Sequence, residues 1–76
     1  MKKTSIGKNC EISKSSIIHD NVTIEDNVKI SDFCIIGFDP KKKYDKKLLI
    51  KNNTIINSHT TIYGGSKIGE NNLIGH

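Results

Sequence analysis

The sequence lacks several residue types on which common protein classes depend. It contains no arginine, no alanine and no glutamine, and aromatic residues make up 5% of its 76 positions. All formal positive charge therefore comes from lysine, and the net charge is a mild +4 at pH 7. Nucleic-acid recognition usually uses arginine, aromatic residues or a known module, so we expect no nucleic-acid partner.

Long apolar runs and paired cysteines are also missing. No run approaches the ~18 residues of a membrane-spanning helix, and no apolar core follows the two lysines after Met1, as a secretory signal would require. We expect a cytoplasmic protein without a membrane span. Cys10 and Cys34 lack the CxxC spacing of zinc ribbons and redox pairs, which favours reduced thiols packed in the protein.

Isoleucine, in contrast, is abundant and regularly spaced. Eleven of the fourteen isoleucines lie at 6, 12, 18, 24, 30 and 36, and then at 50, 56, 62, 68 and 74. Six residues turn an α-helix by about 600°, which would scatter these side chains over three sides. On a strand, an even step keeps all of them on one side. The period therefore predicts short strands that each bury one isoleucine.

Each six-residue unit also predicts a bend. Two positions before the isoleucine the residue is usually small, and three positions after it six of the ten complete units have asparagine or glycine, which tolerate left-handed backbone angles. These residues are Asn9, Asn21, Asn27, Asn53, Asn71 and Gly65. Strands joined by regular bends wind into a prism whose turns pair in parallel. We predict an all-β parallel β-helix of about three and a half coils with one loop excursion.

This pattern resembles the hexapeptide-repeat acyltransferases from Ile6 to His76. The resemblance implies a left-handed parallel β-helix, three hexapeptides per coil, a homotrimer, and acetyl-coenzyme A as co-substrate. The chain is most similar to the sugar and nucleotide-sugar N- or O-acetyltransferases, in which a G-x-x-P segment, a lysine-rich stretch and a resumed hexapeptide follow in this order. The implied activity is transfer of an acetyl group to a sugar or nucleotide-sugar, at a site between subunits.

The break in the period divides the chain. We expect one β-helix domain over 1–76, with a first block at 6–41, a basic loop at 42–49 and a second block at 50–76. The last residue lies two places into a repeat, so we expect an N-terminal fragment of a longer transferase. Around the break, Lys41, Lys42, Lys43 and Tyr44 are candidates for contacts with ligand phosphates, because lysine binds phosphate as a point charge; the alternative is a solvated loop.

Three histidines are candidates for the general base of acyl transfer. His76 ends an isoleucine-glycine-histidine step that is similar to the step carrying the base in some family members, so we assign it first. His19 at a turn and His59 at a left-handed position suit surface roles. The zinc-dependent γ-class carbonic anhydrases share the prism, but none of the histidine spacings fits their pattern, and we expect no metal.

Outside the expected basic loop, four apolar residues fall at outward positions, just before an inward one: Ile17, Ile35, Ile55 and Leu73. An exposed apolar stripe usually marks an interface, so we expect these residues to form the trimer contact. The pairs 17/35 and 55/73 are each one coil apart. If the break contains one distorted side of the prism, all four align, which we prefer; if it is a pure excursion, the stripe changes face. The alternative function is a non-catalytic β-helical scaffold or oligomerisation module.

Overall fold

The computed structural model describes residues 4–38 and 47–75. These residues form short strands joined by bends and turns. The strands are β1 (Ser5–Ile6), β2 (Glu11–Ile12), β3 (Ile17–Ile18), β4 (Val22–Ile24), β5 (Lys29–Ile30), β6 (Ile35–Phe38), β7 (Leu48–Ile50), β8 (Ile55–Ile56), β9 (Thr61–Tyr63), β10 (Lys67–Ile68) and β11 (Leu73–Ile74).

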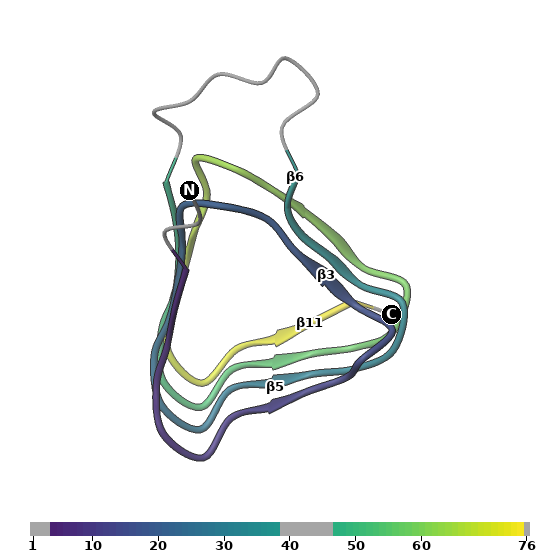
Figure 1. Cartoon of the computed structure of the whole chain (residues 1–76). Helices are drawn as coiled ribbons and strands as arrows, with labels where there is room; N and C mark the ends of the chain where they lie inside the picture. The colour runs from purple at the N-terminus through teal and green to yellow at the C-terminus, as the bar shows by residue number, and fades with distance from the viewer. Residues whose placement is uncertain (1–3, 39–46, 76) are drawn as a thin grey trace.

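The strands stack into three parallel sheets, which form the sides of a triangular prism (Figure 1). We call the outer surfaces face A (β1, β4, β7 and β10), face B (β2, β5, β8 and β11) and face C (β3, β6 and β9). Each strand pairs with the strand one coil away, for example Ile17 with Ile35. The architecture is the predicted parallel β-helix.

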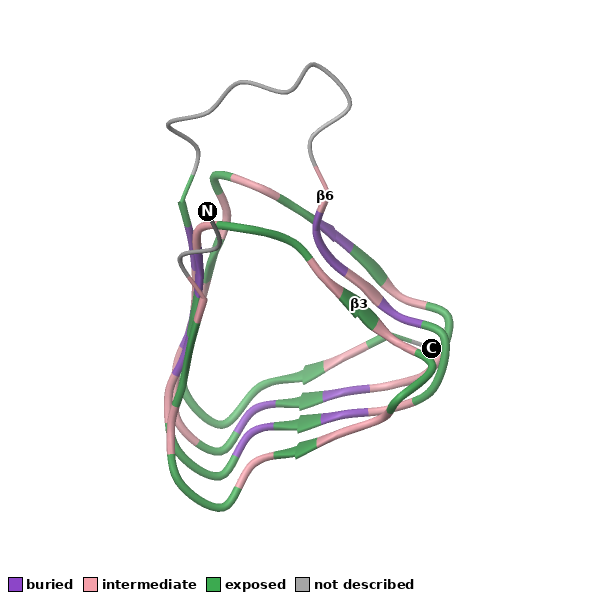
Figure 2. Cartoon of the chain, in the orientation of Figure 1, coloured by how far each residue is buried: buried purple, intermediate pink, exposed green. Residues whose placement is uncertain are grey.

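The prism interior is a column of isoleucine. Ile24, Ile30, Ile36, Ile50 and Ile56 are all 1% exposed or less. The inward residues of the first coil are more open, and Ile6 is 52% exposed. Figure 2 shows this gradient, with the buried residues in the middle coils. Each coil therefore gains its burial from the coils stacked on either side of it.

The corners confirm the predicted bends. All six predicted residues have positive φ, from 56° at Asn71 to 87° at Gly65. His59 also takes the left-handed conformation, with φ 61°, as its place in the repeat predicted. Phe33 was not predicted and has φ 58°. A phenylalanine side chain disfavours this conformation, so its place at an exposed corner implies a compensating contribution from elsewhere.

Four of the small inward residues make hydrogen bonds that we did not predict from the sequence. Their thiols and hydroxyls donate hydrogen bonds to carbonyl oxygens fifteen residues later: Cys10 to Glu25 at 3.1 Å, Ser16 to Ser31 at 2.6 Å and Thr54 to Gly69 at 2.8 Å. Cys34 donates to the carbonyl of Asn57 in the same way, across the break. These bonds tie successive coils together, and both cysteines are free. Among the described residues no buried side-chain nitrogen or oxygen lacks a partner.

The break is a pure excursion, so our preferred alignment of the apolar stripe is wrong. Val22 pairs with Leu48, 26 residues later, whereas a normal coil advances 18. The fourteen-residue step from Ile36 to Ile50 is thus one six-residue side plus eight inserted residues. Strand β7 begins at Leu48, so Leu48 and Leu49 belong to the prism and not to the basic loop that we placed at 42–49.

Residues 4–38 and 47–75 contain no helix with the length and apolar character that crossing a lipid bilayer requires.

The isoleucine column gives a direct test of the fold. Replacing Ile30, which is 1% exposed, with alanine should lower the free energy of unfolding by about 2–5 kcal/mol, because a cavity opens in a closed core. Ile6→Ala, at the same place in the repeat but 52% exposed, should cost less than about 1 kcal/mol. Urea unfolding followed by circular dichroism measures both, and equal losses would contradict the stacked-coil core.

Candidate functional site

Most of the site residues expected from the sequence lie outside the described residues. This holds for the proposed general base, His76, and for the proposed phosphate contacts, Lys41, Lys42, Lys43 and Tyr44. The assignments remain predictions. What the structure does place are the two ends of the excursion, Phe38 and Lys47, and the surfaces around them.

The four expected interface residues form two pairs on two different faces. Ile17 and Ile35 are paired neighbours on face C, whereas Ile55 and Leu73 are paired neighbours on face B. Ile17, Ile55 and Leu73 are 54%, 41% and 68% exposed. Faces B and C share one edge, which we call the Phe33 edge because Phe33 lies on it, 59% exposed. The apolar surface therefore spans this edge and does not run down a single face.

Face C and its edges carry all the aromatic rings and imidazoles in the described part of the chain. Two sets of ring contacts cross successive coils. At the Phe33 edge, the ring centroids of Phe33 and His59 are 5.2 Å apart. At the opposite edge, Phe38 lies 6.1 Å from His19 and 5.5 Å from Tyr63, the latter in an edge-to-face arrangement. Neither set was predicted from the sequence. The inserted residues between β6 and β7 change the spacing of the repeat, so the spacing alone does not align residue 38 with residue 63.

We call the second edge, where the chain passes from face C to face A, the loop corner. Backbone hydrogen bonds hold both ends of the excursion against neighbouring coils there. Gly64 N–H donates to the Phe38 carbonyl at 2.8 Å, and Gly65 N–H donates to the Lys47 carbonyl at 3.0 Å. Phe38, Tyr63 and the exposed Lys47 therefore lie at one corner, although they are distant in the sequence.

A glycine makes this arrangement possible. The register of β6 and β9 shifts between Ile36 and Phe38, and Gly37 is the extra residue, with φ +85°. A Cβ at this position would come within 2.7 Å of Val22 Cγ2. Because Gly37 absorbs the shift, the Phe38 side chain points outward beside Tyr63.

The other two histidines are on the surface. His19 follows β3 at the loop corner and is exposed, with its ring beside Phe38. His59 is exposed at the Phe33 edge. These positions agree with the surface roles expected for both. The ring neighbours of His19 and His59 are Phe38 and Phe33, which are aromatic and not carboxylates.

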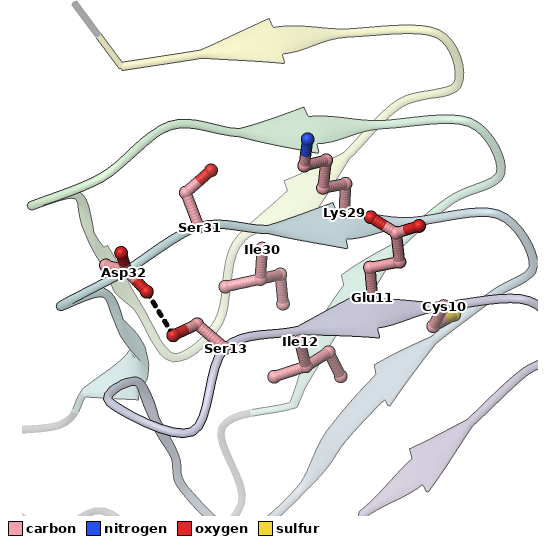
Figure 3. A pocket seen from close by; sticks show the side chains of 8 residues that line it. All are labelled: Cys10, Glu11, Ile12, Ser13, Lys29, Ile30, Ser31 and Asp32. Carbon is pink, nitrogen blue, oxygen red and sulfur yellow. Dashed lines mark hydrogen bonds between the residues drawn. The ribbon is translucent and has the colours of Figure 1, made fainter.

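A depression of about 520 Å³ lies along strands β2 and β5. In Figure 3, Glu11 and Lys29 lie on one side of these strands, and Ile12 and Ile30 point to the other. At one end Ser13 donates a hydrogen bond to Asp32, the dashed line in the figure. Ser15 also donates to Asp32, at 3.2 Å. These bonds join the first coil to the second. Ser13, Ser15 and Asp32 therefore hold the two coils together at this corner.

The described residues contain no group of three histidine, cysteine, aspartate or glutamate side chains placed to hold a metal ion.

Comparison with known proteins identifies the repeat. Residues 3–38 match the family model described as bacterial transferase hexapeptide (six repeats). The match spans strands β1 to β6, slightly less than half of the chain, and the same coil geometry continues in residues 47–75. No curated protein and no solved structure matches the chain.

The geometry of the loop corner predicts a strong dependence on Gly37. Gly37→Ala should lower the free energy of unfolding by about 2–5 kcal/mol, because alanine is strained at this φ and its Cβ meets Val22. Gly69→Ala is the matched control: its Cβ would be 3.4 Å from the nearest atom, and we expect a loss below about 1 kcal/mol. Chemical denaturation of the two variants measures the difference, and equal stability would contradict the tight corner.

Proposed function

We propose that this chain is part of an acyltransferase that moves an acetyl group from coenzyme A to a sugar or nucleotide-sugar. The observation that carries the proposal is the match of residues 3–38 to the hexapeptide repeats of bacterial transferases. The lysine-rich sequence between Phe38 and Leu48 supports a phosphate-bearing ligand, since coenzyme A and nucleotide-sugars both carry phosphates.

The reaction requires little from the protein. The acceptor amine or hydroxyl attacks the thioester carbonyl, the carbon–sulfur bond breaks, and coenzyme A leaves as the thiol. A general base takes the proton from the attacking group, and backbone N–H groups can stabilise the oxyanion. His76 is our assignment for the base, because its isoleucine-glycine-histidine step is similar to that of the family.

We also propose that three copies assemble with the Phe33 edge turned toward a shared axis. In a closed three-fold ring, each copy contacts its two neighbours through two different surfaces, whereas a two-fold dimer uses one surface twice. The apolar pairs on faces B and C supply two surfaces that meet at one edge. Burial of the Phe33 ring between copies would offset the cost of its left-handed backbone.

The alternative function, a non-catalytic scaffold or oligomerisation module, is favoured by one observation. The exposed apolar residues of faces B and C could hold copies of the chain together, and this role requires no catalytic residue. Assembly into trimers that neither bind acetyl-coenzyme A nor release its thiol would support this function over the transferase.

The base assignment predicts the effect of removing the imidazole. With acetyl-coenzyme A and a panel of sugars and UDP-sugars as acceptors, His76→Ala should slow thiol release by about 10²–10⁴-fold, the usual contribution of a general base. Thr23→Ala, at an exposed position in strand β4 of face A, is the control and should retain most of the activity. If His76→Ala transfers acetyl groups at the normal rate, the assignment is wrong.

The three-fold arrangement predicts that both apolar pairs are needed. Ile35→Lys on face C and Ile55→Lys on face B should each reduce the assembly to monomers, because each buries an unpaired charge at a cost of about 3 kcal/mol or more. Thr23→Lys on face A, an exposed outward position of the same kind, should leave the mass unchanged. Light scattering after size-exclusion chromatography gives the masses. An assembly broken by only one of the two lysines would instead indicate a single-face dimer.

A further inference from the structure

We propose that the loop corner binds the nucleotide part of the ligand. In this site the Tyr63 ring stacks on the base, Phe38 supports Tyr63 from the side, and Lys47 pairs with a phosphate. The proposal rests on the proposed function, because it names where the nucleotide of the coenzyme or of the acceptor would lie. It adds a binding role for aromatic residues that the repeat pattern does not require.

The Tyr63 ring is available for stacking. Its side chain is 53% exposed, although it contacts Phe38 edge-to-face at 5.5 Å. That contact limits the orientations of the Tyr63 ring, because Phe38 is half-buried and also contacts His19. An aromatic ring that is restrained but exposed loses little conformational freedom when a planar base stacks on it.

The corner also offers positive charge at the appropriate place. The carbonyl of exposed Lys47 accepts a hydrogen bond from Gly65, two residues after Tyr63, so the ammonium group extends from the same corner. Asp20 is the one carboxylate among the described residues of this corner, and it follows His19 in the first coil. Because Asp20 repels an anion, we expect a bound phosphate to lie nearer to Tyr63 than to His19.

A nucleotide explains an exposed aromatic ring beside a lysine better than a protein partner does. The other exposed aromatic pair, Phe33 with His59, lies between apolar residues and suits a contact between copies. The Tyr63 side of face C lies instead beside a lysine, and a ring next to a cation matches a ligand that carries both a base and a phosphate.

The experiment is calorimetric titration of the protein with UDP, ADP and inorganic pyrophosphate. Tyr63→Leu should weaken UDP or ADP binding about five- to a hundredfold, the effect of losing one base stack, and leave pyrophosphate binding unchanged. Tyr63→Phe retains the ring and should bind as the wild type does. Lys47→Gln should weaken both nucleotide and pyrophosphate binding severalfold. Circular dichroism and assembly mass confirm that each variant keeps its fold.

The outcomes separate the possibilities. Tighter binding of UDP points to a nucleotide-sugar, tighter binding of ADP points to coenzyme A, and either result with the expected Tyr63 dependence supports the site. Nucleotide binding that is unaffected by Tyr63→Leu, or no nucleotide binding at millimolar concentration, overturns it. Thiol release from acetyl-coenzyme A tests the proposed function independently, so activity without Tyr63 dependence would reject this site alone.

Discussion

The contact on which the whole structure depends is one isoleucine stacked on another along the inside of each sheet. The register places Ile24 beside Ile50, Ile30 beside Ile56 and Ile36 beside Ile62. Strands of two to four residues bury too little surface to be stable alone. The column fixes the register of all three sheets, and the register then decides which outward residues become neighbours on each face.

The sequence predicted the fold because its period is simple. A six-residue spacing excludes a helical core face, and asparagine or glycine at a constant offset predicts the bends. The exceptions also have physical explanations. Phe33 adopts a backbone conformation that its side chain does not favour, so no local rule could place it there. The hydrogen bonds from Cys10, Ser16 and Thr54 link residues fifteen apart, and only the stacked coils bring these atoms together.

The candidate site was less predictable, because it depends on the phase across the break. A fourteen-residue step can be divided as twelve plus two or as six plus eight, and spacing alone does not distinguish them. The pairing of Val22 with Leu48 shows that the step is six plus eight. This result separates the two apolar pairs onto adjacent faces and brings Phe38 beside Tyr63. His76 and Lys41 to Lys43 lie outside the described residues, so their roles remain predictions.

The excursion leaves the hydrogen-bonded ladder intact, and this has a consequence for how such a prism can change over evolution. Closing a 26-residue loop in place of an 18-residue one costs only about 0.3 kcal/mol of additional chain entropy. Each coil contacts only its neighbours, so a longer connection at one corner does not disturb the others. New binding chemistry can therefore be acquired at a corner, one insertion at a time, while selection on the isoleucine column continues unchanged.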